Sequence, residues 1–144
     1  MTSENNIPKR YLASETTLHL KQSIVCLRFD MKPLNGIIYE AYENGQLMYE
    51  RNYKDGKEDV LLRGWYEDGQ LKYECNVKDG KKDGLERWWH ENGQLEYEYN
   101  YKDGKKDGLD RTWYENGQLK YECNFKDDLL ISEKGYDKDG NLKI

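Results

Sequence analysis

The sequence predicts an all-β fold, an extended single-layer antiparallel meander of stacked β-hairpin repeats that is curved and twisted. A six-residue motif, Tyr or His followed by Glu-Asn/Asp-Gly-Gln-Leu, occurs four times, and its glycines at 45, 69, 93 and 117 are 24 residues apart. Between these motifs, Asp-Gly pairs separate short segments rich in Tyr, Trp and charged residues. A fixed period of this size is typical of stacked supersecondary units, and no segment keeps a helical period of 3.6.

Residues 1–36 lack this period and are predicted to form an N-terminal arm and a capping hairpin. Residues 1 to about 16 read as an arm or a loose cap. Two short strands, 18–21 and 24–29, are expected around a two-residue turn at Gln22-Ser23. Terminal units of a repeat protein must differ from internal ones, which supports a capping role for this block.

Residues 37–144 are predicted to form about four and a half repeats. Each full repeat contributes two strands, and the repeats are joined by an Asp-Gly turn followed by a second Asp-Gly that forms a bulge. Val60 takes the place of the second glycine in the first connection. The predicted repeat bounds are 37–60, 61–84, 85–108, 109–131 and 132–144.

The loop length determines which side chains share a face. A three-residue loop, Glu91-Asn92-Gly93 with Gly93 in the left-handed conformation, predicts pairing of Trp89 with Leu95, Arg87 with Tyr97 and Leu85 with Tyr99. This register gives an apolar face and a polar face, as expected for a one-sided antiparallel sheet. In the central repeat the predicted apolar face holds Leu85, Trp89, Leu95, Tyr97, Tyr99 and Tyr101, while Trp88, Glu74, Glu96, Glu98 and Glu122 fall on the polar face.

Several repeated positions are interpreted as structural. Arg63, Arg87 and Arg111 would lie opposite Tyr73, Tyr97 and Tyr121, either stacked on the rings as structural elements or as partner contacts. The predicted structural repeat positions are Trp65, Trp89, Trp113, Gly45, Gly69, Gly93 and Gly117.

The unit Gly-Leu-x-Arg-x-Trp-Tyr-Glu-Asn-Gly-Gln-Leu-x-Tyr-Glu-x-Asn-Tyr-Lys-Asp-Gly-Lys-Lys-Asp-Gly, nearly literal from Gly84 to Gly117, resembles the MORN variant repeat of bacteria. The chain is similar to YwqK-type antitoxin or immunity proteins, and the resemblance covers about residues 33 to 144. Ala41, where other copies have tryptophan, marks a degenerate first repeat. The resemblance implies a curved sheet of hairpins with a protein-binding role and no catalytic residues to carry over.

The chemistry-bearing residues do not form a recognisable active site. The two histidines lie in unlike contexts and the three cysteines lack Cys-x-x-Cys spacing, so neither a catalytic triad nor a zinc site is expected. The stretch 137–141 faintly resembles a calcium loop but lacks the twelfth-position glutamate. We therefore expect no enzyme activity, no cofactor and no bound metal.

Cysteine placement and hydropathy bear on location. Cys75 and Cys123 occupy the same repeat position about 19 Å apart, beyond the roughly 7 Å that a disulfide spans between Cα atoms. Reduced cysteines fit a cytoplasmic location. The longest apolar runs are too short for a signal peptide or a membrane span.

Charge narrows the class of partner. Residues 37–144 hold 18 Lys and Arg against 25 Asp and Glu, a net charge of −7, which disfavours nucleic acid and anionic membranes. A single-layer sheet leaves more apolar surface than a monomer usually exposes, so a protein partner is expected, or a second copy that would make a homodimer.

The first hypothesis is therefore an immunity protein or antitoxin that binds and occludes a cognate toxin with a basic surface. The second hypothesis is a structural or scaffolding protein that acts through self-assembly or docking of another partner. For Trp88, cross-strand packing remains the alternative to partner binding. The candidate partner-binding residues are Trp88, Tyr66, His90, Tyr114, Glu74, Glu96, Glu98 and Glu122.

Overall fold

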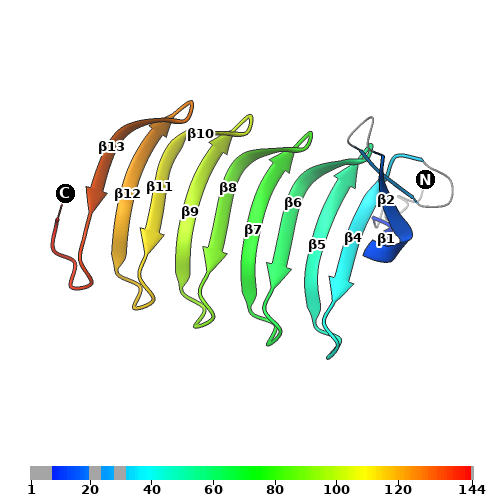
Figure 1. The fold of residues 1–144 in the computed structure, drawn as a ribbon, viewed down its shortest axis with the longest axis horizontal. Coiled ribbons are helices and arrows are strands. Elements are labelled where there is room, and N and C mark those ends of the chain that lie inside the picture. The colour runs from blue at the N-terminus through cyan, green and yellow to red at the C-terminus, as the bar shows by residue number, and fades with distance from the viewer. Residues whose placement is uncertain (1–7, 20–23, 28–31, 144) are drawn as a thin grey trace, which may run out of the picture.

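A computed structural model describes residues 8–19, 24–27 and 32–143 of the chain. In this part of the chain the strands lie side by side in one open, curved sheet, with hairpin turns along both long sides (Figure 1). A short 3-10 turn, η1 (Ala13–Glu15), follows the first strand. The strands are β1 (Arg10–Leu12), β2 (Thr16–His19), β3 (Ile24–Leu27), β4 (Gly36–Ala41), β5 (Leu47–Lys54), β6 (Lys57–Trp65), β7 (Leu71–Lys78), β8 (Lys81–Trp89), β9 (Leu95–Lys102), β10 (Lys105–Lys106), β11 (Gly108–Trp113), β12 (Leu119–Lys126) and β13 (Leu129–Gly135).

The main sheet has eleven strands in the order β1-β4-β5-β6-β7-β8-β9-β11-β12-β13, with β10 also paired to β9. Every pairing in it is antiparallel except the parallel pair β1–β4. The predicted fold class, a single-layer meander of hairpin repeats, is confirmed.

The N-terminal edge of the sheet contains a strand that periodicity did not predict. Arg10–Leu12 pairs in parallel with Ile37–Tyr39, and the Ile37 amide donates to the Lys9 carbonyl at 2.8 Å. Strands β2 and β3 form a separate antiparallel pair. Residues 1–7 and the predicted turn Gln22-Ser23 lie outside the described residues, so the expected arm and turn are not described there.

The predicted three-residue loops are confirmed. In the third repeat the His90 amide donates to the Gln94 carbonyl and the Gly93 amide to the His90 carbonyl, at 2.8 and 2.9 Å. Gly93 has φ 82°, the left-handed region that favours glycine. Trp89 pairs with Leu95 as predicted.

Beyond this first pair, the predicted register is wrong. The register shifts between Trp88 and Trp89, so that Trp88 faces Tyr97 and Arg87 faces Glu98. A bulge at Glu96 accounts for the shift, because two residues of β9 then oppose one of β8. The predicted pairs Arg87–Tyr97 and Leu85–Tyr99 are replaced by charge-on-charge and ring-on-ring contacts, which are more favourable than arginine against tyrosine.

The Asp-Gly connections between repeats are tight turns followed by bulges. Asp79 and Gly80 both have positive φ, 50° and 78°, as a type I′ turn requires. A second register shift lies between Cys75 and Val77, which confirms the predicted bulge. Val60 stands where later repeats have glycine and has φ 73°, a strained conformation for a β-branched residue.

The shifted register divides the side chains between two faces. The aromatic face carries Tyr73, Trp88, Tyr97, Tyr99 and Tyr101. The opposite face, here the ladder face, carries the alternating charges Glu50, Arg63, Glu74, Arg87, Glu98, Arg111, Glu122 and Lys134, each cross-strand to the next. The buried hydrophobic core is correspondingly thin and consists of Leu34, Ile38, Cys75 and Val77 among the described residues.

Candidate binding surface

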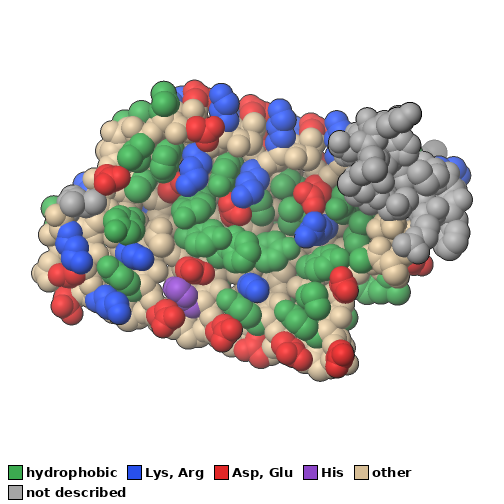
Figure 2. All heavy atoms as spheres, viewed as in Figure 1, with side chains coloured by type: hydrophobic (Ala, Val, Ile, Leu, Met, Phe, Trp, Pro, Cys, Tyr) green, Lys and Arg blue, Asp and Glu red, His purple; other side chains and the backbone are tan. Residues whose placement is uncertain are grey.

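Four aromatic rings form a continuous stack at the centre of the aromatic face. The Trp88 ring lies 5.0 Å from Tyr73 and 5.7 Å from Tyr97, between ring centroids, with interplanar angles of 24° and 31°. Tyr97 in turn stacks on Tyr99 at 4.6 Å. Figure 2, which views this face, shows hydrophobic side chains in a band across the middle strands.

Trp88 occupies a position that is small in the neighbouring repeats. Its equivalents are Gly64, which pairs with Tyr73, and Thr112, which pairs with Tyr121. A side chain on Gly64 would clash with the Tyr73 ring, which lies against that glycine. Trp88 is therefore an addition to the repeat pattern, and comparing aligned repeats could have revealed it.

Two lysine–carboxylate pairs are set among the rings. Lys82 Nζ lies 2.7 Å from Glu86, and Lys106 Nζ lies 2.8 Å from Asp110. Glu86 and Asp110 are only 9% and 3% exposed, so their charges depend on these lysines. Sequence reasoning missed both pairs, although in each the acidic residue follows its lysine by four positions.

The lysines of these pairs also contact the rings. Lys106 Nζ lies 4.0 Å from the Tyr99 ring centroid, and Lys82 Nζ lies 4.7 Å from that of Tyr101. Burial, followed by the nearby Glu86 carboxylate, raises the pKa of Tyr101 to about 12. The pKa of Tyr97 is raised for the same two reasons, burial first. The raised pKa values therefore keep Tyr97 and Tyr101 protonated at neutral pH.

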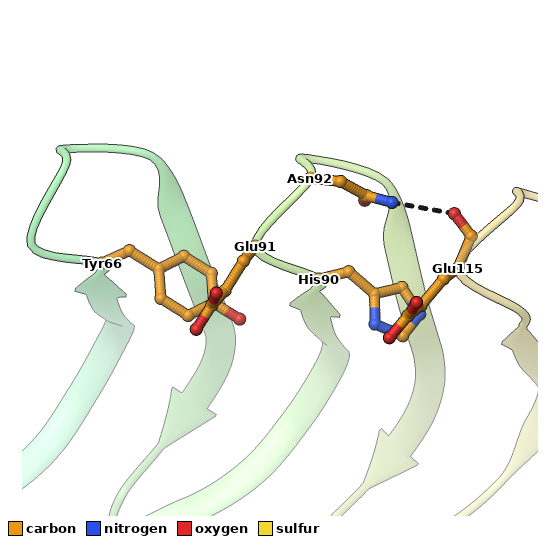
Figure 3. Close-up of a pocket in the computed structure, with 5 residues that line it drawn as sticks. All are labelled: Tyr66, His90, Glu91, Asn92 and Glu115. Carbon is orange, nitrogen blue, oxygen red and sulfur yellow. Dashed lines mark hydrogen bonds between the residues drawn. The ribbon is translucent and has the colours of Figure 1, made fainter.

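A pocket of about 440 Å³ lies beside the hairpin turn of the third repeat. It is lined by Tyr66, His90, Glu91, Asn92 and Glu115. Figure 3 shows the His90 ring next to the Glu115 carboxylate and the Tyr66 ring next to the Glu91 carboxylate. A second pocket of about 350 Å³ beside the preceding turn shares Tyr66 and Glu91. Each pocket therefore combines a ring from one repeat with a carboxylate from the next.

Hydrogen bonds between successive repeats hold these pockets in place. The Tyr66 hydroxyl donates to the Trp89 carbonyl at 2.6 Å, and Asn92 Nδ2 donates to the Glu115 carbonyl at 2.8 Å. The same tyrosine bond recurs from Tyr42 and Tyr114. We call Tyr42, Tyr66, His90 and Tyr114, with Glu67, Glu91 and Glu115, the turn-edge row.

The third repeat differs from its neighbours along this row. Lys72 and Lys120 place their ammonium groups 5.2 and 5.4 Å from the ring centroids of Tyr66 and Tyr114. The equivalent residue in the third repeat is Glu96, and the ring there is His90. The pKa of Tyr66 is raised by burial and then by the Glu91 and Glu96 carboxylates. Negative charge therefore gathers beside His90, where the second and fourth repeats carry a lysine.

The structure separates the predicted partner-binding residues into two groups. Trp88, Tyr66, His90, Tyr114 and Glu96 belong to the aromatic face and the turn edge that adjoins it. Trp88 is not on the polar face, as the predicted register required, because the bulge at Glu96 moves it among the tyrosines. Glu74, Glu98 and Glu122 lie on the ladder face.

On the ladder face, these three glutamates pair with the repeated arginines. Arg87 contacts both Glu98, at 2.7 Å, and Glu74, at 3.4 Å. Arg111 contacts Glu122 at 2.9 Å, and Arg63 contacts Glu74 at 3.7 Å. The predicted placement of these arginines opposite Tyr73, Tyr97 and Tyr121 is thus wrong, and their partners are carboxylates.

The remaining chemistry-bearing residues have structural surroundings. Asp137 accepts hydrogen bonds from the Asp139 and Asn141 amides at 3.0 and 2.8 Å, which closes the last turn. Cys75 and Cys123 are free thiols, and burial raises the pKa of Cys75 to about 11. In the described ranges, three or more His, Cys, Asp or Glu side chains nowhere gather in a metal-binding arrangement. None of the helical structure described there has the length and apolar content of a membrane span.

The repeats themselves match a known family. A family model described as the MORN repeat variant matches residues 34–55, 58–79, 82–103 and 106–127, which together make up more than half of the chain. Each match spans one hairpin, with its two strands and the turn between them, and ends at the aspartate that begins the connection to the next repeat. No curated protein and no solved structure matches the chain.

Proposed function

The chain belongs to the MORN repeat variant family, a non-enzymatic repeat module, and from this premise we propose that it is a non-catalytic protein-binding module. Its docking surface in this proposal is the aromatic face together with the turn-edge row. The observation that carries the proposal is the ring stack around Trp88, because it departs from the repeat pattern without being needed by it. Aromatic clusters of this kind are the usual anchors of protein interfaces.

The proposed partner is a basic protein, and specifically a cognate toxin that the sheet occludes. The net charge of −7 over residues 37–144 attracts a basic surface and speeds its encounter. The turn-edge pockets offer a ring and a carboxylate to an incoming Lys or Arg side chain. The resemblance to YwqK-type antitoxin or immunity proteins, which is an expectation from the sequence alone, favours the same choice. Reduced cysteines are compatible with a cytoplasmic site of action.

A scaffold that polymerises end to end is less well supported. Open-ended stacking requires a free strand at both ends of the array. At the N-terminal end, however, the edge strand is β1, which has only three residues and offers little backbone for pairing. We therefore favour a module that binds one partner over a self-assembling filament.

The experiment that tests this proposal is neutralisation of a candidate toxin encoded beside this chain, with binding kinetics on the purified pair. Trp88→Ser and Tyr114→Ser should accelerate dissociation, because both remove aromatic contact area. Reversing charge at Glu91, Glu96 and Glu115 should slow association, and the effect should fade with salt as steering is screened beyond about 8 Å.

Failure to co-purify with or protect against any such toxin would remove the antitoxin assignment. If binding occurs and both sets of variants bind with wild-type kinetics, the docking surface is not the aromatic face.

A further inference from the structure

The last strand of the array exposes three consecutive aliphatic residues. Leu129, Leu130 and Ile131 at the start of β13 are 70%, 50% and 60% exposed. β13 pairs with β12 on one side and forms the C-terminal edge of the sheet on the other. An exposed edge strand with apolar side chains is a template for pairing with another strand.

These aliphatic residues replace charged ones. The corresponding starts of β6, β8 and β10 read Lys57-Glu58-Asp59, Lys81-Lys82-Asp83 and Lys105-Lys106-Asp107. β6 and β8 each lie between two neighbouring strands and β10 pairs with β9, yet all three keep charges there. The terminal strand, where a soluble cap would need polar residues, is the one that carries hydrophobic residues. Because the apolar residues lie on the exposed edge strand and the charged residues on the internal strands, the start of β13 is better explained as an interface than as a cap.

The geometry restricts what can cover this edge. The described N-terminal elements lie at the opposite end of the sheet (Figure 1), so they do not reach it. The far end of β13 is already occupied, because Tyr136 bridges to Leu142 and the Lys143 amide donates to the Gly135 carbonyl at 2.7 Å. The open part of the edge therefore runs from Leu129 to about Glu133.

We propose that two copies of this chain pair through these open edges, with their β13 strands antiparallel about a two-fold axis near Leu130. An antiparallel edge is self-complementary under such an axis, and the three-residue edge strand β1 at the other end offers a head-to-tail partner little to pair with. The axis sets Leu129 of each copy against Ile131 of the other. It also keeps the occupied ends at Gly135 out of the overlap.

The dimer goes beyond the proposed function and leaves the docking surface free. A two-fold axis perpendicular to the sheet keeps both aromatic faces on the same side of the joined sheet. The shared edge is shorter than a standard interface, which buries about 800 Å² per partner, so we expect a weak, concentration-dependent dimer. Two linked aromatic faces would still raise the avidity for a partner with repeated binding sites.

Sedimentation velocity of the full chain over about 5 to 500 µM tests the proposal directly. The wild-type protein should shift from monomer to dimer, and Leu129→Lys/Ile131→Lys should remain monomeric throughout. Val60→Lys is the matched control, since Val60 is 66% exposed but lies within an internal strand; it should dimerise like the wild type. A wild-type chain that is monomeric at every concentration overturns the proposal, whether or not the edge then accepts a foreign strand.

A crosslinking measurement tests the position of the axis without relying on a charged variant. Directly opposed residues in an antiparallel pair have Cβ atoms about 5 Å apart. Leu130→Cys should therefore form a disulfide-linked dimer under mild oxidation, whereas Val60→Cys should not. Equal crosslinking of the two variants, or none from Leu130→Cys, contradicts the two-fold pairing.

Discussion

The two faces of the sheet follow different rules. On the ladder face, acidic and basic side chains alternate strand by strand from Glu50 to Lys134, and the pattern does not change from repeat to repeat. On the aromatic face, the third repeat is distinctive, with Trp88 where its neighbours have Gly64 and Thr112. The ladder face, which holds the array together, therefore repeats the same charges in every repeat. The aromatic face, which is proposed to bind the partner, differs from one repeat to the next.

This difference has a physical basis. A slip of one residue would separate the opposite charges, for example by setting Arg87 against Tyr97 or Tyr99, so the ladder helps to specify the register of the strands that it crosses. Cross-strand charge pairs that specify the register must therefore occur in each repeat. A binding site needs its special residues only where the partner makes contact, and a stack of rings in one repeat meets that need.

The largest effect should come from a buried charge pair on the aromatic face. Lys106→Met keeps the length of the side chain but leaves the Asp110 carboxylate, 3% exposed, without its cation. We expect the free energy of unfolding to fall by about 3 kcal/mol in urea titrations.

Lys126→Met is the control for this change, because Lys126 lies at the same 2.8 Å from Asp107 but is 62% exposed. Its effect on the free energy of unfolding should be far smaller, because solvent screens an exposed ion pair. Similar losses in the two variants would show that burial does not distinguish the pairs.

Trp88→Thr tests whether the ring stack belongs to the fold or to binding. The substitution installs the residue that the next repeat has at Thr112, so the backbone should accept it. Loss of two ring contacts should cost about 1 to 2 kcal/mol of unfolding free energy, while partner affinity should fall by tenfold or more. A loss of stability above about 4 kcal/mol, the level of a collapsed core, would instead assign Trp88 to the fold.

On the ladder face, stability should depend more on the alternation of acidic and basic residues than on how many charged residues there are. Arg87→Glu sets three carboxylates side by side at Glu74, position 87 and Glu98, and should cost about 1 kcal/mol in thermal unfolding. Adding Glu98→Arg restores an opposite pair and should recover part of that loss. No recovery in the double variant, at low salt, would argue against the ladder as a register device.

A smaller effect is expected at alkaline pH. Because the pKa of Tyr101 is raised to about 12 in the folded chain, against an ordinary value of 10.0, the folded state retains a proton that the unfolded state loses. The resulting stabilisation is complete below pH 10 and disappears as the pH rises toward 12. Solvent screening at this partly exposed ring limits it to less than about 1 kcal/mol. Tyr101→Phe should flatten this part of the pH–stability curve.

Much of the fold was predictable from local signals. The Asn-Gly and Asp-Gly pairs specify turns through their left-handed glycines, and the period of 24 residues follows directly from them. The bulge at Glu96 was not predictable in this way, because it depends on the balance between Arg87–Glu98 and Arg87–Tyr97 contacts across strands. That one residue exchanged the faces of Trp88 and Trp89. The buried pairs at Glu86 and Asp110 were missed because a charge in a strand ordinarily indicates a solvated face.

The most direct test of the account removes equal charge from the two faces and measures binding of the purified partner. Glu91→Gln/Glu115→Gln acts on the turn-edge row, and Glu74→Gln/Glu98→Gln acts on the ladder face. Both variants change the net charge by two, so long-range steering is affected alike. We predict that the first variant lowers affinity by about tenfold or more and the second by less than about twofold. Equal losses, or a larger loss from the ladder face, would contradict the assignment of binding to the aromatic face and its turn edge.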